Sequence, residues 1–329
     1  MKTPPTISLP HGVRDILPGE AGSIARIESS IFEVFEGYNF ERVITPLLEY
    51  VDVLSLGMGR ELKDKVFKFM DPATGRVVAI RPDITPQIAR LVATRMRELP
   101  LPLKLYYREN VLRFQERGKG GPAEILQIGA EFISKEPAPA IDAEMIIIAI
   151  EALKNIGIKD FRIDIGDVGF VRKVLEGIDV TAEERKLIKN TIAKKDNSGL
   201  EKILDNLNGK VGSDDKNMLL ALTTLYGEEE VIDKATEIAE KAGAGKSLSY
   251  LREVLSIIGE KGLKEFITID LGEVRGFDYY TGIIFEGFSR SVGKAILGGG
   301  RYDNLTGSYG YEASATGFAF NVDNIVSAI

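Results

Sequence analysis

Between two predicted strands in the last fifth of the chain, the sequence reads Arg275-Gly276-Phe277-Asp278-Tyr279-Tyr280-Thr281-Gly282. An arginine can make two parallel hydrogen bonds to a carboxylate, and tyrosine rings supply a flat wall and a hydroxyl group. Glycines among these residues allow the backbone to come close to a ligand. The competing interpretation is a strand with ordinary aromatic packing. The stretch therefore predicts either one wall of a site for a small carboxylic acid or a buried strand.

Two further stretches carry residues of the same chemical kind. In the first, Arg113 ends a predicted strand, and a charged glycine-rich loop leads to a second strand that carries Gln127 and Glu131. Residues four apart on a strand point to the same face, so these two could hold an ammonium group, although charged residues usually face solvent. The second stretch is Gly298-Gly299-Gly300-Arg301-Tyr302-Asp303. Its glycines permit close approach to a ligand, and a flexible turn explains them equally well.

The composition excludes several other classes of protein. The 329 residues are 44% hydrophobic, which is enough for a large core and for two domains. The absence of cysteine excludes a disulfide framework and thiolate metal sites, and the single histidine, His11, excludes a multi-histidine metal site. We expect no metal and no cofactor. The net charge of −7 argues against nonspecific binding to nucleic acid. The N-terminus lacks a signal-peptide core and no aliphatic run approaches the roughly 18 residues that span a bilayer, which favours a cytoplasmic protein without membrane contact.

Hydrophobic periodicity predicts an α+β fold. Apolar residues at three- and four-residue spacings indicate helices at 20–37 and 142–155. Alternating or continuous apolar runs indicate strands at 40–49, 66–70, 77–81, 103–114, 125–133, 161–165, 266–271, 279–288 and 294–297, and a strand runs into a helix at 316–329. Turn residues at 71–75 predict a hairpin, so the sheet should be mostly antiparallel. Pro46 cannot donate to a ladder, so we expect the strand at 40–49 to lie at a sheet edge or an interface.

Between 168 and 262 the pattern is helical, with mixed charges and glycine breaks. Strand character returns after it. We therefore predict a discontinuous core, formed by 1–167 and 263–329, and a helical insertion at 168–262.

These stretches together resemble histidyl-tRNA synthetase, a class II aminoacyl-tRNA synthetase, over roughly residues 8–329. Residues 275–280 and 299–303 are similar to the two histidine-specific motifs of that family, 113–131 to class II motif 2, and the region of Pro46 to motif 1, the dimer interface. The resemblance implies a class II catalytic core with a mostly antiparallel sheet flanked by helices. It also implies a histidine site, with Asp83, Thr85, Gln127 and Glu131 facing the amino group, Tyr279 and Tyr280 facing the imidazole, and Arg113 and Arg275 near the carboxylate.

The departures from the synthetase pattern lie where ATP would bind. Asn324 stands at the place of the motif 3 arginine that contacts the γ-phosphate in synthetases. In motif 2, Gln115 replaces an acidic residue, and Gly121 and Ala123 replace loop arginines. Each lost guanidinium removes a charge-assisted phosphate contact, so we do not expect adenylation or any other catalysis by this chain. The chain also ends about where the synthetase core ends, which leaves no room for an anticodon-binding domain and predicts no tRNA binding.

A paralogous family fits both the retained and the lost features. The segment Arg81-Pro82-Asp83-Ile84-Thr85-Pro86-Gln87 is similar to that of the regulatory subunit of ATP phosphoribosyltransferase, and it also reads as a helix N-terminus with Thr85 as cap. The resemblance implies a subunit without catalytic residues that assembles with and activates a short-form catalytic subunit in a hetero-octamer. It also implies a homodimer through motif 1 and feedback inhibition by L-histidine in the first step of histidine biosynthesis.

Two other interpretations remain open at the level of the sequence. An active or fragmentary histidyl-tRNA synthetase would exchange pyrophosphate with ATP when histidine is present. A scaffold with a dead pocket would assemble with a partner and bind no histidine.

Overall fold

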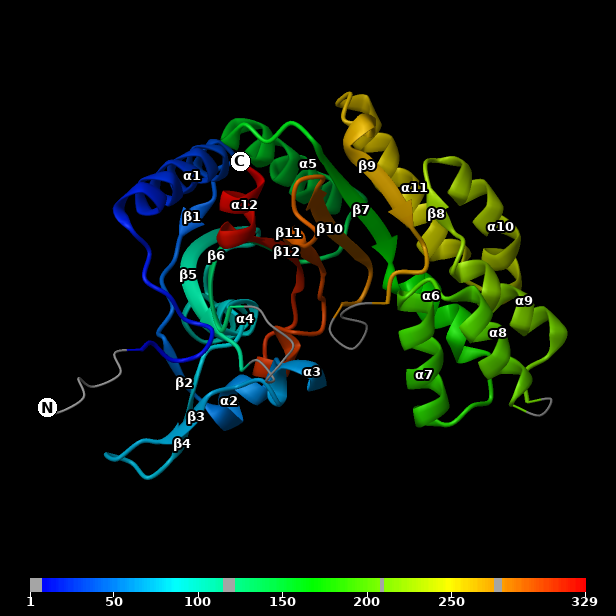
Figure 1. Cartoon of the computed structure of the whole chain (residues 1–329), viewed down its shortest axis with the longest axis horizontal. Coiled ribbons are helices and arrows are strands. Elements are labelled where there is room, and N and C mark those ends of the chain that lie inside the picture. The colour runs from blue at the N-terminus through cyan, green and yellow to red at the C-terminus, as the bar shows by residue number, and fades with distance from the viewer. Residues whose placement is uncertain (1–7, 115–121, 208–209, 275–279) are drawn as a thin grey trace, which may run out of the picture.

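The computed structural model describes residues 8–114, 122–207, 210–274 and 280–329, and a nine-stranded sheet forms its centre (Figure 1). From one edge to the other, the strands are β1 (Glu41–Arg42), β5 (Leu103–Leu112), β6 (Glu124–Ser134), β12 (Ser314–Asn321), β11 (Ala295–Arg301), β10 (Ile283–Ser289), β7 (Phe161–Asp167), β9 (Ile267–Asp270) and β8 (Tyr226–Gly227). The pairs β1–β5 and β7–β9 are parallel, and the other neighbours are antiparallel. The predicted fold class, a mostly antiparallel sheet with flanking helices, is confirmed.

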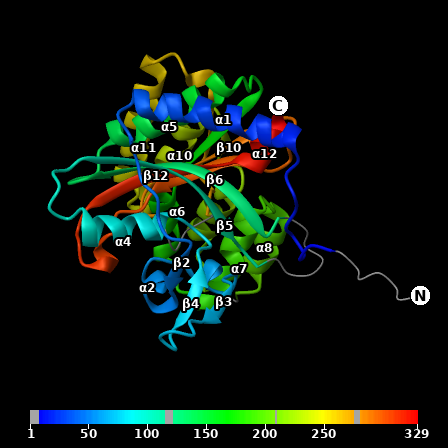
Figure 2. The same cartoon turned by 90° about the vertical axis from the view of Figure 1, so that its left-hand side faces the viewer.

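Helices cover both faces of this sheet (Figure 2). On one face lie α1 (Pro18–Gly37), α5 (Pro139–Ile156) and α12 (Val322–Ala328), and on the other lies α4 (Thr85–Arg95). A smaller sheet of β2 (Leu48–Tyr50), β4 (Val77–Ile80) and β3 (Lys68–Met70) packs against α2 (Val51–Leu56) and α3 (Arg60–Lys63). Its β3–β4 hairpin turns at 71–75, as predicted.

The alternation of side chains along β6 explains how polar groups reach the α4 face. Ile128, Ala130 and Phe132 belong to the core under α1 and α5, so Gln127 and Glu131 point the other way. Full burial of a large apolar side chain contributes about 1.5–3 kcal/mol. A slip of one residue in register would exchange the two faces, so the apolar residues hold the polar ones in place.

Residues 168–262 are mainly helical and lie at the end of the sheet formed by β7, β9 and β8, on the right in Figure 1. They contain α6 (Val168–Glu176), α7 (Ala182–Ala193), α8 (Asn197–Asp205), α9 (Ser213–Leu222), α10 (Glu230–Ala242) and α11 (Gly245–Glu260), with β8 between α9 and α10. Helix α11 packs against α5, and one continuous hydrophobic cluster runs from α1 and α5 into these helices. Two short 3₁₀ helices, η1 (Lys264–Phe266) and η2 (Gly307–Tyr309), lie in the C-terminal part.

The helices at 20–37 and 142–155 are confirmed, with bounds extended by one to three residues. The single strand predicted at 40–49 is wrong, because the chain forms β1 in the large sheet, passes Pro46 outside any strand, and forms β2 in the small sheet. The flexible turn offered for residues 298–300 is also wrong, because they lie within β11 and are paired on both sides. A side chain at Gly299 would overlap Phe318 and the backbone of Gly317, which accounts for this glycine. Within the described part of the chain, no helix has the length and hydrophobicity needed to cross a membrane.

Candidate functional site

A cavity of about 260 Å³ lies on the face of the sheet opposite α1 and α5, at the start of α4. Its lining combines charged and hydroxyl side chains with a floor of small residues. The lining residues are Asp83, Thr85, Arg113, Gln127, Tyr280, Glu286, Ala295, Leu297, Gly298, Gly299, Tyr302, Gly317, Phe318, Ala319 and Asn321. The cavity is close in size to the smallest typical ligand pockets, which begin at about 300 Å³, so it suits an amino acid better than a larger ligand.

Glu131 lies beneath this cavity, only 1% exposed, in a ring of hydroxyl groups. The Thr85 hydroxyl donates to Glu131 Oε1 over 2.8 Å, the Tyr302 hydroxyl donates to Oε2, and Tyr107 contributes a third hydrogen bond. Burial raises the pKa of Glu131 to about 8, although the hydroxyl donors partly oppose that rise. The carboxyl group is therefore mostly neutral at pH 7.

Two glycines make room for this ring. A β-carbon at Gly317, which pairs with Glu131 across the ladder, would overlap the Glu131 carboxylate. At Gly129 a β-carbon would overlap the Tyr107 hydroxyl. Because the polar groups occupy the space where side chains would stand, only glycine fits at these two positions.

Asp83, Arg113 and Glu286 are the ionisable acidic and basic side chains of the lining. The Asp83 carboxylate accepts the backbone N–H of Ile84 over 2.9 Å, and Arg113 Nε donates to the carbonyl oxygen of Pro82 over 2.7 Å. Burial raises the pKa of Asp83, and the positive charge of Arg113 opposes this. Burial, followed by the charges of Asp83 and Glu131, also raises the pKa of Tyr280, so its hydroxyl remains protonated.

Gln127 presents an acceptor that the described residues do not satisfy. Its Oε1 atom is buried and has no hydrogen-bond partner among them. A buried amide oxygen without a partner costs free energy, which a ligand that donates a hydrogen bond would recover. The carboxylate of Asp83 and the oxygen of Gln127 suit an ammonium group, and the guanidinium of Arg113 suits a carboxylate.

Most of the predicted site residues converge on this cavity. Asp83, Thr85, Arg113, Gln127 and Tyr280 line it, and Glu131 adjoins it through Thr85 and Tyr302. Pro46 lies apart, in the coil between β1 and β2, where its carbonyl oxygen accepts from Gln87 Nε2 over 2.8 Å. Of the other predicted residues, Arg275 and Tyr279 lie outside the described residues, as do Gln115 and Gly121.

One predicted role is wrong, and two residues were missed. Thr85 does not cap α4, because the helix begins at Thr85 itself and its hydroxyl is committed to Glu131. Sequence reasoning noted Tyr302 only as part of a glycine-rich stretch and did not identify Tyr107. The alternation along β5 holds a signal for Tyr107, since it falls on the same face as Leu105 and Val111, but it does not say what the hydroxyl meets.

The two described positions that depart from the synthetase pattern have structural roles. Asn324 Nδ2 donates to the carbonyl oxygen of Ala295 over 2.7 Å, and its backbone N–H donates to Asn321 Oδ1 at the start of α12. Ala123 is buried. Its backbone N–H donates to the carbonyl oxygen of Gly12, and its carbonyl oxygen accepts from the backbone N–H of Arg113. Neither side chain carries a positive charge toward a phosphate group. Among the described residues, no group of three or more acidic, histidine or cysteine side chains could hold a metal ion.

Comparison with known proteins identifies the class of fold to which this chain belongs. A family model described as histidyl-tRNA synthetase matches residues 12–325. A structure from Bacillus halodurans, described as an ATP phosphoribosyltransferase regulatory subunit/histidyl-tRNA synthetase, is similar with TM-score 0.91 and 30% identity, over 100% of this chain and 84% of that one. A histidine–tRNA ligase subunit from Alicyclobacillus acidocaldarius gives TM-score 0.83 and 27% identity, over 98% of this chain and 97% of the other. The fold is that of the histidyl-tRNA synthetase class.

Similar proteins with curated names identify the family within that class. The ATP phosphoribosyltransferase regulatory subunits of Geobacter metallireducens and Geobacter sulfurreducens are 44% and 45% identical to this chain, over 98% and 99% of its length and 73% and 74% of theirs. That of Clostridium botulinum is 36% identical over 98% of this chain and 76% of its own. The chain belongs to the family of ATP phosphoribosyltransferase regulatory subunits.

The raised pKa of Glu131 predicts a specific dependence of stability on pH. The unfolded chain loses this proton near pH 4.5, whereas the folded chain keeps it up to about pH 8, so the folded state loses stability as pH rises through that range. In Glu131→Gln, the free energy of unfolding should fall less between pH 5 and pH 8 than in the wild type. Urea unfolding at several pH values measures this. The exposed control Glu98→Gln should keep the wild-type dependence, and an equal fall in Glu131→Gln would contradict the assignment.

Proposed function

We propose that this chain is a cytoplasmic, non-catalytic regulatory subunit that binds L-histidine in the cavity beside Glu131. The observation that carries the proposal is the arrangement of Asp83, Gln127 and Arg113 around one small cavity. Opposite charges and an open acceptor in that arrangement match the ammonium and carboxylate groups of a free amino acid. In this proposal, Tyr280 and the ring of hydroxyl groups around Glu131 contact either the side chain of the ligand or its amino group. Arg275 and Tyr279 complete the site in this proposal.

The partner in the proposal is a short-form ATP phosphoribosyltransferase catalytic subunit. Relatives at 44% and 45% identity are named as regulatory subunits of that enzyme, which supports it. This chain would assemble with the catalytic subunit in a hetero-octamer, activate it, and transmit feedback inhibition by histidine. Histidine would act by binding the inhibited assembly more tightly than the active one. The uncharged side chains of Asn324 and Ala123 support a role without ATP activation.

The unpaired side-chain oxygen of Gln127 predicts which ligands bind and how strongly. Isothermal titration of the wild type should show binding of L-histidine and none of ATP. Gln127→Leu keeps the volume but removes the acceptor for the ammonium group, so the affinity should fall about 10- to 150-fold, the equivalent of about 1.5–3 kcal/mol. The stability of the variant should be unchanged or higher, because an unpaired buried oxygen is lost.

Asn190→Leu removes an exposed amide on α7 and is the matched control, with wild-type affinity expected. Tight binding of ATP would instead favour an active synthetase. If neither ligand binds the chain or its complex, the scaffold interpretation holds.

The proposed partnership predicts that this chain and L-histidine change the activity of the catalytic subunit. Adding this chain to a short-form catalytic subunit should raise the rate of phosphoribosyl transfer to ATP, and L-histidine should suppress that rate. With Gln127→Leu, activation should persist while the histidine concentration for half inhibition rises in proportion to the loss of affinity. An inhibition curve that stays at its wild-type position despite weakened binding would place the inhibitory histidine elsewhere.

We also propose that the chain forms a homodimer through the region around Pro46. Large apolar side chains are exposed there and on the adjoining small sheet: Ile44 (76%), Leu47 (48%), Leu48 (42%), Phe69 (44%) and Met70 (67%). Exposed apolar side chains gathered in one region mark a surface that associates with another protein. The aliphatic side chains flank Pro46 in the sequence, as expected of a motif 1 interface.

Ile44→Asp should therefore weaken the dimer, because it would bury an unpaired charge at the interface. We expect a rise in the dissociation constant of roughly 30-fold or more, which corresponds to an interface hot spot of ~2 kcal/mol. Sedimentation equilibrium measures it. Ile329→Asp is the control, because Ile329 is 72% exposed but lies at the C-terminus, far from β2–β4 in Figure 1. Equal dissociation constants for the two variants would rule this surface out.

A further inference from the structure

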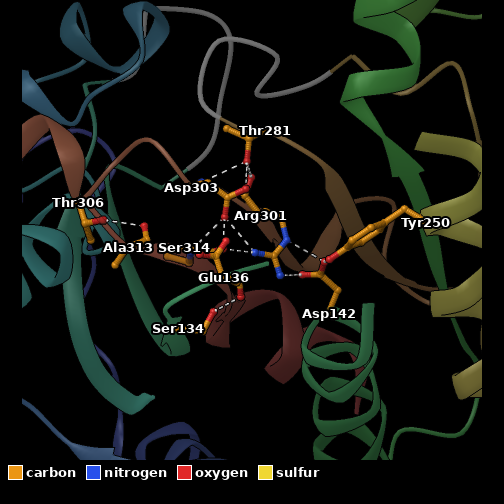
Figure 3. Close-up of polar contacts among 11 residues, drawn as sticks. Ser134, Glu136, Asp142, Tyr250, Thr281, Arg301, Asp303, Thr306, Ala313 and Ser314 are labelled. Atoms are coloured by element: carbon orange, nitrogen blue, oxygen red, sulfur yellow. Dashed lines mark hydrogen bonds and ion pairs between the residues drawn. The ribbon is translucent and has the colours of Figure 1, made fainter. Parts of the chain in front are cut away.

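A buried ion pair joins β11 to α5, and a tyrosine from α11 completes it (Figure 3). Arg301 Nε and Nη2 donate to the two carboxylate oxygens of Asp142 over 2.8 and 2.9 Å, and these residues are 3% and 0% exposed. The Tyr250 hydroxyl donates to Asp142 Oδ2 over 2.8 Å. Burial raises the pKa of Tyr250, so its hydroxyl remains a donor. The region 168–262 thus touches the carboxylate that orients Arg301.

The other end of Arg301 leads to the segments that line the cavity. Arg301 Nη1 donates to Asp303 Oδ1 over 2.9 Å and to Ser314 Oγ over 2.6 Å. The Thr281 hydroxyl donates to Asp303 Oδ2 over 3.0 Å, and the backbone N–H of Thr281 donates to the carbonyl oxygen of Arg301 over 2.7 Å. Thr281 follows Tyr280 and Arg301 precedes Tyr302, and both of these tyrosines line the cavity. The network therefore spans from α11 to two walls of the pocket.

A second contact reaches the same wall from α6. Arg172 Nη2 donates to the backbone carbonyl oxygen of Tyr280 over 3.1 Å. Helices α6 and α11 meet close by, where a β-carbon at Gly169 would lie 2.8 Å from Asp167 Oδ1 and 2.9 Å from Ser247 Oγ. The two helices therefore pack against each other near the Arg172 contact, although none of the residues that line the cavity comes from 168–262.

We propose that Tyr250 and Arg172 are positioning residues that couple the helices α6 and α11 to the ligand pocket. The inference rests on the proposed function, because it takes L-histidine as the ligand. A ligand that fixes Tyr280 and Tyr302 also fixes the Arg301 network and, through it, the two helices. Coupling between sites is reciprocal, so a partner that moves these helices changes the affinity of the pocket by the same factor.

Tyr250→Phe is the selective variant for this test. It removes one hydroxyl and leaves the Arg301–Asp142 pair intact, whereas loss of Asp142 or Arg301 would leave a buried charge unpaired and endanger folding. Tyr38→Phe is the matched control, because the Tyr38 hydroxyl also donates to a carboxylate of α5, Glu151 Oε2 over 2.9 Å, but lies on the α1 side. Equal melting temperatures of the two variants would show that folding is retained.

The first measurement is hydrogen–deuterium exchange of the full chain without ligand. The amides of 281–282 and 300–303 should exchange about fivefold faster or more in Tyr250→Phe, the lower end of typical coupling, and at the wild-type rate in Tyr38→Phe. Equal rates in the two variants would overturn the inference, whether or not histidine binds.

The second measurement adds saturating L-histidine. In the wild type and in Tyr38→Phe, exchange should slow in α6 and α11. In Tyr250→Phe, that protection should be lost in α11 and the affinity for histidine should fall about fivefold. Histidine binding to the wild type without any change in α6 and α11 would also overturn the inference. No histidine binding to the wild type would refute the proposed function instead, and the ligand-free comparison would still decide the coupling.

Discussion

The ion pair between Arg301 and Asp142 holds together the layers that carry the pocket. Its two parallel hydrogen bonds join β11 to α5 in a place closed to solvent. Removing one partner of a buried pair costs about 3–5 kcal/mol, whereas replacing both by apolar residues is often neutral. The pair therefore contributes little to the net stability of the fold, and its main effect is to fix the position of β11 relative to α5. Tyr302, the next residue, donates a hydrogen bond to Glu131 on β6.

Around Glu131 the protein uses hydroxyl groups where a counter-ion would be expected. Thr85, Tyr107 and Tyr302 come from α4, β5 and the end of β11, and they meet one carboxyl group whose pKa burial raises to about 8. A positive charge brought beside this carboxyl would favour its ionised form. Empty and occupied pockets would then differ in charge as well as in contacts. The glycines at 129 and 317 are part of this design, because any side chain there would displace the ring.

Beside the cavity, the two described positions that depart from the synthetase pattern make local structural contacts. Asn324 supports the start of α12 and the backbone of β11, and Ala123 supports the N-terminal segment at Gly12. These are neutral, local contacts. Among the charged residues that line the cavity, Asp83 suits an ammonium group and Arg113 suits a carboxylate group. Under the proposed function, the use of this site is conformational coupling and not bond chemistry.

Local patterns in the sequence were sufficient for the α+β class and for α1 and α5, since apolar periodicity depends on neighbours along the chain. The family resemblance named five of the fifteen residues that line the cavity. Local patterns could not show that residues 298–300 form a paired strand, that the run at 40–49 is shared between two sheets, or that the Thr85 hydroxyl binds Glu131 and does not cap α4. Those outcomes depend on contacts between residues far apart in the chain. Tyr250 and Asp142 are separated by 108 positions, and Arg301 and Asp142 by 159. Only packing in three dimensions brings such groups within hydrogen-bonding distance, and burial there decides which of them stay charged.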